Sequence, residues 1–200
     1  MYLSKVELDT KKRETSRALY DRGKLHSILE DCFPGERQHP LWRLEANQGS
    51  YSLIILSNDK PDFESLYLRI GRGIGKTIDY TPFLTMVCDE GRILNYLISF
   101  NPVICKNGSR IPLNLKRTTN RNYCAEDWLK DRLEKNGAKV LEAFSKDSGT
   151  VRIKEGKGRI FIATYQGRLV ITDPARFRNV LENGLGHAKA YGCGLISVLP

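Results

Sequence analysis

The sequence lacks a long apolar run, an apolar leader and closely paired cysteines. No apolar stretch approaches the roughly 18 residues that a membrane span requires, and the opening MYLSKVELD carries charges where a signal peptide has its apolar core. The five cysteines, at positions 32, 88, 105, 124 and 193, are odd in number and widely spaced. This spacing fits neither a disulfide framework nor a CxxC metal site. We therefore expect a soluble cytoplasmic protein with reduced thiols, no metal site and no membrane partner.

The first half of the chain lacks net charge. Residues 1–100 hold 14 Lys+Arg against 14 Asp+Glu, whereas residues 101–200 hold 18 against 9, so the second half carries the whole excess of +9. A basic region of this kind is typical of a polyanion partner, because each neutralised phosphate releases condensed counterions. The alternative is a soluble protein that is basic without such a partner.

Residues 1–100 contain patterns typical of strands and helices in alternation. Residues 2–9 alternate as a half-buried strand does, and residues 24–33 place an apolar stripe on one helical face, with Gly23 ending whatever precedes it. Two further strands are predicted at 41–47 and 51–57, around a short turn. We expect a weaker helix after Pro61 and a strand near residues 76–80.

Residues 101–200, with the strand just before them, repeat this order. Residues 92–102 read as a strand and residues 124–137 as a helix that stops at Asn136-Gly137. Further strands are VRIK and RIFIATY around a KEGKG turn, RLVITD after a turn at Gln166-Gly167, and the final LISVLP. Asp173 and Pro174 predict the start of a helix that Gly184 ends. Strand, helix, two strands, helix, strand, found twice, predicts an α+β protein of two tandem ferredoxin-like domains, at residues 1–82 and 91–200.

Residues 71–77, GRGIGKT, have the appearance of a nucleotide-binding P-loop. That motif needs four residues between its first glycine and the Gly-Lys pair, and Ile70 stands at the required first position. No amphipathic helix follows to complete an anion site. We interpret Arg72 and Lys76 as part of a flexible basic turn.

The C-terminal stretch GLGHAKAYGCG, residues 184–194, is rich in glycine. Glycine permits positive φ and exposes backbone amides without a Cβ atom, so a sugar-phosphate backbone could approach closely. Lys189 adds a positive charge, Tyr191 a ring on which a base could stack, and His187 a possible phosphate contact. The alternative is that Gly184 only caps a helix and the others tighten a turn.

His26 is the second singular residue. On a helical wheel it lies about 100° from Leu25 and about 20° from Phe33, so it borders the apolar stripe. A half-shielded imidazole can act as a base near neutral pH. The alternative is a packing histidine, since nothing local marks it as catalytic.

Several segments together resemble the CRISPR-associated endoribonuclease family CasE. They are MYLSKVELD, KLHSIL with its histidine, LWR at residues 41–43, SFNP, WLKDRLEKNG, and the stretch from Gly167 to Pro200. They occur in the family's order from end to end of the chain. The resemblance implies tandem ferredoxin-like domains, a glycine-rich C-terminal loop, and metal-independent cleavage of precursor CRISPR RNA without a cofactor. It also implies a repeat stem-loop and the subunits of the type I-E surveillance complex as partners.

The resemblance assigns catalysis to His26. The histidine would take the proton from a ribose 2′-hydroxyl, which attacks the neighbouring phosphate and leaves a 2′,3′-cyclic phosphate and a 5′-hydroxyl. Several members carry a tyrosine at the position of Gly23, so a second catalytic group is open here. Lys24 and Ser27 are the neighbours that could orient the hydroxyl or stabilise the phosphate.

RNA binding is expected mainly in the second half. A hairpin tip holds Lys154, Lys157 and Arg159, and a basic loop includes Arg117 and Arg121. Such side chains bind duplex RNA through phosphates and shape; the alternative is a solvated hairpin and loop. A non-catalytic RNA-binding subunit of a CRISPR ribonucleoprotein is the competing function.

Overall fold

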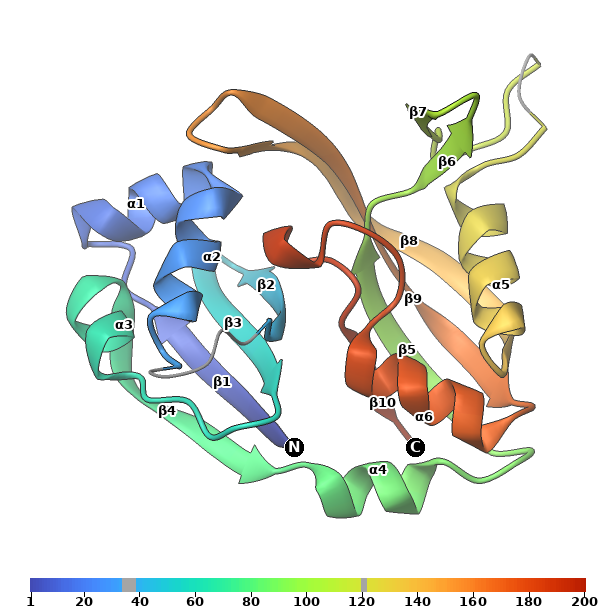
Figure 1. Cartoon of the computed structure of the whole chain (residues 1–200), viewed down its shortest axis with the longest axis horizontal. Coiled ribbons are helices and arrows are strands. Elements are labelled where there is room, and N and C mark those ends of the chain that lie inside the picture. Colours follow the sequence, from blue (N-terminus) through green and yellow to red (C-terminus); the bar gives the residue numbers. More distant parts are fainter. Residues whose placement is uncertain (34–38, 120–121) are drawn as a thin grey trace. The chain divides into compact units, whose positions relative to one another are not determined.

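The computed structural model describes residues 1–33, 39–119 and 122–200 (Figure 1). The chain splits into two compact units. The first contains Met1–Phe83, Val151–Ile160 and Lys189–Gly192, and the second contains Leu84–Thr150, Phe161–Ala188 and Cys193–Pro200. A hairpin tip and a short C-terminal stretch therefore group with the first unit. The domain ranges expected from the sequence, 1–82 and 91–200, stay predictions.

The first unit is built on a four-stranded sheet. Its elements in chain order are β1 (Tyr2–Leu8), α1 (Arg13–Tyr20), α2 (Arg22–Glu30), β2 (Leu41–Asn47), β3 (Ser50–Ser57), α3 (Glu64–Arg69) and β4 (Gly71–Asp79). The strand order is β2-β3-β1-β4, and β1 runs antiparallel to both of its neighbours. This is the order of a ferredoxin-like βαββαβ unit.

The helices of the first unit pack on one face of this sheet. Val6 on β1 and Leu53 on β3 are paired in register and fully buried. Leu25 and Leu29 of α2 join them in one apolar cluster, together with residues of α1 and α3. The cluster fixes which side of α2 faces the core, and hence where His26 lies.

The second unit repeats the arrangement. Its elements are α4 (Thr81–Val87, which begins in the first unit), β5 (Ile93–Phe100), β6 (Val103–Lys106), β7 (Ser109–Pro112), α5 (Ala125–Lys135), β8 (Ala138–Ile153), β9 (Gly158–Ile171), α6 (Pro174–Asn183) and β10 (Ile196–Leu199). The sheet order β10-β5-β9-β8 is again ferredoxin-like, and β6 and β7 form a separate hairpin. The expected α+β fold with two ferredoxin-like units is confirmed.

Trp128 of α5 anchors the core of the second unit. Its ring stacks on Phe100 with the centroids 5.0 Å apart, and its Nε1 donates to the carbonyl oxygen of Val103 at 3.0 Å. Such a stacked pair satisfies the indole N–H while it buries both rings. From α6, Phe177 and Leu181 are buried in the same unit.

Three local predictions were wrong. Gly23 lies inside α2 and ends nothing, and α1 precedes it although no helix was predicted there. The flexible basic turn expected at residues 71–77 is instead part of the edge strand β4, which confirms the strand predicted near residues 76–80. Residues Gln166 and Gly167 lie within β9, which runs unbroken where a turn was expected. Among the described residues, no helix is long and apolar enough to cross a membrane.

Candidate functional site

Helix α2 holds His26 at the edge of the first unit's core. Asp21 caps the helix, because its carboxylate accepts from the Gly23 N–H at 2.7 Å. Leu25 and Leu29 on either side of the histidine are fully buried. The His26 side chain keeps 19% of its surface exposed, and its Nε2 lies 3.5 Å from Oε1 of Glu30, one turn later. The imidazole is therefore largely shielded, with a carboxylate beside its Nε2.

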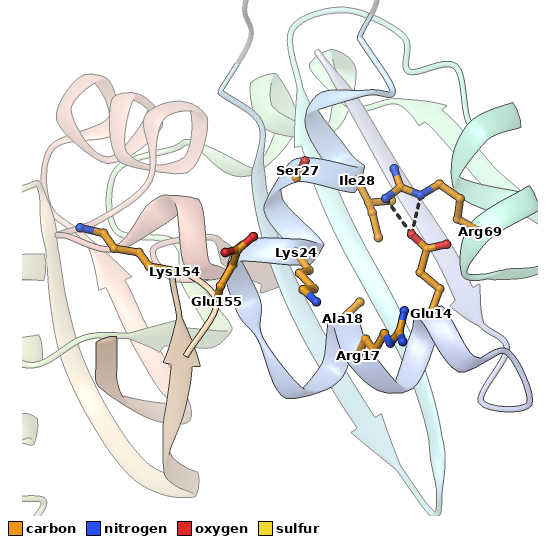
Figure 2. Close-up of a pocket in the computed structure, with 10 residues that line it drawn as sticks. Glu14, Arg17, Ala18, Lys24, Ser27, Ile28, Arg69, Lys154 and Glu155 are labelled. Atoms are coloured by element: carbon orange, nitrogen blue, oxygen red, sulfur yellow. Dashed lines mark hydrogen bonds and ion pairs between the residues drawn. The ribbon is translucent and has the colours of Figure 1, made fainter. Parts of the chain in front are cut away.

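Lys24 and Ser27 face a different side of α2. Both are exposed and line a pocket of about 530 Å³ (Figure 2). The other residues that line it are Glu14, Arg17, Ala18, Gly23, Ile28, Arg69, Lys154 and Glu155. His26 is not among them, because successive helical residues turn by about 100° and Lys24 is about 200° away around the axis. The three residues predicted as catalytic are therefore not brought to one point.

Positive charge prevails in this pocket, although part of it is neutralised. Arg69 pairs with Glu14 at 2.7 Å and with Asp31 at 2.8 Å. Arg17 and Lys24 lie along the α1 and α2 walls in Figure 2, while Glu155 directs its carboxylate toward α2. A pocket lined in this way can accept an anionic group between helix and hairpin.

A short 3-10 helix, η1 (Lys189–Tyr191), packs against α2 and β2 in the first unit. The contact is close, because a Cβ atom on Gly192 would lie 2.8 Å from the indole ring of Trp42. The guanidinium of Arg22 lies 5.8 Å from the centre of the same ring. Lys189 and Tyr191, predicted to bind RNA, therefore lie on a segment that packs against the helix bearing His26.

Arg22 is a candidate that sequence reasoning missed. It lies one turn before His26, about 40° away around the helix axis, and it is half-buried. The i, i+4 spacing was the available signal. Because the predicted helix started at residue 24, Arg22 fell outside it.

The four glycines between residues 184 and 194 adopt the positive φ that glycine permits. Their amides are mostly engaged, however. Gly184, Gly192 and Gly194 donate to the carbonyl oxygens of Val180, Lys189 and Ser99, at 2.8, 3.1 and 2.8 Å. Gly186 is exposed, but a Cβ atom there would lie 2.8 Å from Trp128. Turn geometry and close packing thus explain most of this segment, and the exposed residues are Gly186 and His187.

The basic hairpin joins the ends of β8 and β9. Lys154, Lys157 and Arg159 are all exposed. Lys154 and Glu155 have φ of 53° and 55°, and Gly156 follows with 82°. The tip is therefore a tight left-handed turn that projects cationic side chains into solvent.

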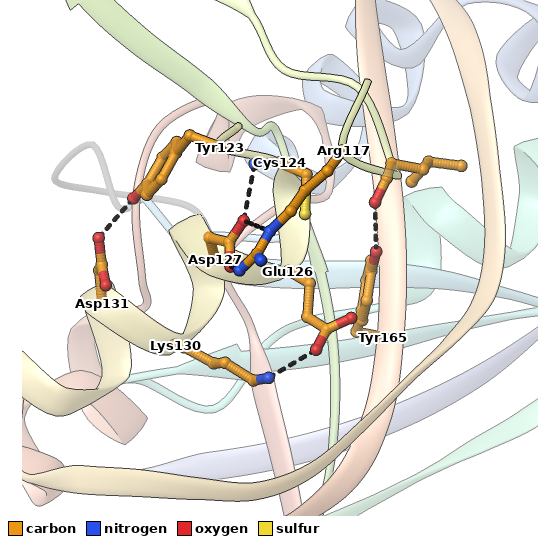
Figure 3. Close-up of polar contacts among 9 residues, drawn as sticks. Arg117, Tyr123, Cys124, Glu126, Asp127, Lys130, Asp131 and Tyr165 are labelled. Atoms are coloured by element: carbon orange, nitrogen blue, oxygen red, sulfur yellow. Dashed lines mark hydrogen bonds and ion pairs between the residues drawn. The ribbon is translucent and has the colours of Figure 1, made fainter. Parts of the chain in front are cut away.

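Arg117 is committed to an ion pair. Its guanidinium donates twice to Asp127, at 2.6 and 3.1 Å, although 62% of the Arg117 side chain stays exposed (Figure 3). Asp127 also accepts from the Cys124 N–H at 3.0 Å, at the start of α5. The hydrogen bonds from Arg117, aided by the Cys124 amide and opposed by partial burial, hold the pKa of Asp127 well below its usual range. Arg121 lies outside the described residues.

Metal ligands do not gather in the part of the chain that the structure describes. No group of three or more His, Cys, Asp or Glu side chains there could hold a metal ion. The five cysteines are free thiols, and Cys32, Cys124 and Cys193 are buried.

Comparisons with known proteins agree along the whole chain. A family model described as CRISPR associated protein matches residues 1–200. The CRISPR-associated endoribonuclease Cse3 of Thermus thermophilus is 28% identical over 222 residues, which cover 100% of both chains. A solved structure of Thermus thermophilus Cse3 bound to an RNA representing a pre-cleavage complex has a TM-score of 0.83 and 25% identity, and the match covers 100% of this chain and 98% of that chain.

A second solved structure, CRISPR endoribonuclease Cse3 bound to a 19 nt RNA, has a TM-score of 0.81 and 26% identity over 100% of both chains. The backbone similarity thus extends over both units. The resemblance to CasE that the sequence motifs indicated is confirmed. Because the family model spans the chain from end to end, this protein belongs to the CRISPR associated protein family.

Proposed function

We propose that this protein is a metal-independent endoribonuclease that binds the stem-loop of CRISPR repeat RNA and cleaves precursor CRISPR RNA. The observation that carries the proposal is the full-length match to a relative named as a CRISPR-associated endoribonuclease. The structure adds a half-buried histidine, His26, on a capped helix whose neighbouring segments are basic. RNA carries its own nucleophile, so the protein need supply only a base, a fixed geometry and positive charge.

In the proposed reaction, His26 takes the proton of a ribose 2′-hydroxyl. The 2′ oxygen attacks the adjacent phosphorus, the bond from phosphorus to the 5′ oxygen breaks, and the leaving 5′ oxygen takes a proton from water, so the products are a 2′,3′-cyclic phosphate and a 5′-hydroxyl end. Arg22, on the same side of α2, supplies positive charge to the phosphate as negative charge develops. Lys24 and Ser27 contact the RNA from the pocket side of the helix.

The RNA is held by the predicted cationic and glycine-rich segments. Hairpin residues Lys154, Lys157 and Arg159 contact phosphates of the stem, and Lys189 and Tyr191 contact the strand near α2. His187, with the exposed backbone at Gly186 and the adjoining Gly184, adds further contacts, as does Arg117 where its ion pair leaves it exposed. The product stays bound within the type I-E surveillance complex. The protein acts in the cytoplasm, where its five free thiols are stable.

A cleavage assay on a repeat hairpin in excess chelator tests this function. His26→Ala should reduce the single-turnover rate by about 10²- to 10⁴-fold, while the Kd for RNA stays within about twofold. His39→Ala, an exposed histidine of the same unit, is the matched control and should cut at the wild-type rate. End-group analysis should find cyclic phosphate and 5′-hydroxyl termini.

Two outcomes would count against the proposal. Wild-type cleavage by His26→Ala with intact binding would remove His26 from catalysis. Tight binding by the wild type without cleavage would instead identify a non-catalytic RNA-binding subunit.

A further inference from the structure

The basic hairpin tip packs against the junction between α1 and α2, and Asp21 connects the tip to α2. Asp21 is only 3% exposed. Oδ1 accepts from the Gly23 N–H at 2.7 Å, and Oδ2 accepts from the Gly156 N–H at 2.8 Å. One buried carboxylate therefore caps the helix that carries His26 and binds the backbone of the hairpin tip.

Two further contacts strengthen this docking. The guanidinium of Arg152 lies 4.3 Å from the centre of the Tyr20 ring, which is within the range of a cation–π interaction. The backbones of Asp21 and Arg152 also form an isolated parallel bridge. The hairpin is therefore attached on both sides of the α1–α2 junction, and all of these residues belong to the first unit.

Gly23 leaves the room that the docked tip needs. A Cβ atom at this position would lie 3.0 Å from Oδ1 of Asp21 and 3.2 Å from the backbone nitrogen of Lys154. The φ angle of Gly23 is not positive, so helix geometry alone would accept another residue. The close approach of the hairpin, rather than the backbone conformation, explains the glycine.

The backbone conformation of the hairpin tip is also energetically unfavourable on its own. Lys154 and Glu155 are non-glycine residues in the left-handed region, and such residues persist only where the surroundings hold them. The hydrogen bond from the Gly156 N–H to Asp21 provides that restraint at the next position. Without the carboxylate, we expect the turn to relax and the tip to leave α2.

We propose that Asp21 is a positioning residue that ties the RNA-gripping hairpin tip to the first turn of the helix bearing His26. This inference rests on the proposed function, in which the hairpin cations hold the RNA and His26 is the base. Asp21 is buried and touches no RNA itself. It makes the position of the bound strand depend on the position of the histidine, so its loss should affect the cleavage step more than affinity.

The test uses the full-length protein and two variants of the dock. Asp21→Asn keeps one acceptor for the helix cap but presents an amide nitrogen to the second N–H, so the hairpin bond is lost. Gly23→Ala adds the Cβ atom that meets Lys154, while alanine favours the helix itself. Asp173→Asn is the matched control, because Asp173 caps α6 through the Arg176 N–H at 3.0 Å in the other unit.

For both dock variants, we expect the single-turnover rate at saturating repeat RNA to fall about tenfold or more. The Kd should stay within about twofold, and the melting temperature of Gly23→Ala should not fall. Hydrogen exchange of the peptide amides at residues 154–157 should accelerate in RNA-free protein for the dock variants and stay unchanged for Asp173→Asn.

Cleavage by Asp21→Asn at the same rate as by Asp173→Asn would overturn the inference. A cleavage rate that falls in each variant only in proportion to the loss of melting temperature would also overturn it. If the wild type binds the hairpin RNA without cutting it, the proposed function fails by a separate observation. The exchange measurement then still decides whether Asp21 ties the hairpin to the helix: unchanged exchange overturns the tie, and faster exchange in the dock variants alone supports it.

Discussion

Two aspartates of this protein each hold a helix start and a second segment at once. Asp21 binds the first turn of α2 and the hairpin tip, and Asp127, within the first turn of α5, binds the N–H of the preceding Cys124 and the guanidinium of Arg117. A carboxylate can do this because it has two oxygens that both accept hydrogen bonds. At the residue scale, such carboxylates connect segments that are distant in the chain or irregular in structure.

The low pKa of Asp127 predicts a stability that depends on pH. Its folded pKa lies below the ordinary value of 3.8, so its ionised form stabilises the folded state above that value, and the contribution is lost as the pH falls through the folded pKa. Asp127→Asn should therefore lower the free energy of unfolding by about 1 kcal/mol at pH 7. The gap to the wild type should be constant down to about pH 5 and narrow as the pH falls below it.

Urea unfolding at several pH values measures this effect. Glu134→Gln, an exposed acidic residue of the same helix, is the control and should change stability by less than about 0.5 kcal/mol. A destabilisation by Asp127→Asn that is equally large at pH 7 and pH 3 would contradict the ionised cap.

At the scale of elements, Gly167 allows a close approach of β8 to the continuous strand β9. A Cβ atom at this position would be 2.0 Å from the carbonyl oxygen of Glu142 and 2.6 Å from its carbonyl carbon. The sequence predicted a turn at this position because glycine after glutamine between two apolar runs is typical of turns. The glycine instead serves the pairing of two long strands.

Gly167→Ala should lower the free energy of unfolding by about 2–3 kcal/mol, because a backbone atom cannot move aside as a flexible side chain can. Gly149→Ala is the matched control: Gly149 lies in β8, has no positive φ, and its added Cβ would meet nothing within 4 Å. Denaturant unfolding of both variants is the measurement. Equal stability of the two would refute the close approach of β8 and β9.

Elements with strong apolar patterning could be predicted from the sequence, and weakly patterned ones could not. The predicted strand at 41–47 matches β2, because its apolar residues are buried where β2 pairs with β3. Helix α1 was missed because only Thr15 and Ala18 of its eight residues are buried. The middle of β8, SKDSGT at residues 145–150, is polar and exposed, which hid a strand of 16 residues.

At the scale of the whole molecule, the repeated order of elements was enough to predict both sheets. The site was less accessible to prediction, because it depends on contacts between distant parts of the chain. Asp21 meets Gly156 across 135 positions, and η1 packs against α2 from near the C-terminus. A local sequence pattern cannot predict contacts between residues so far apart in the chain. Only the capping aspartate at position 21 and the i, i+4 spacing of Arg22 and His26 can be recognised in the sequence itself.

The uneven charge of the chain leads to a prediction about salt. If the excess of +9 in residues 101–200 contacts RNA phosphates, the logarithm of the association constant should fall linearly with the logarithm of the salt concentration. Lys157→Ala, at the exposed hairpin tip, should reduce the magnitude of that slope by about 0.7–0.9, which is one phosphate contact. Lys60→Ala, which removes an exposed lysine from the half without net charge, should leave the slope unchanged. Equal slopes for Lys157→Ala and the wild type would mean that the hairpin lysine is only solvated, and binding titrations of a repeat hairpin at four or more salt concentrations decide the matter.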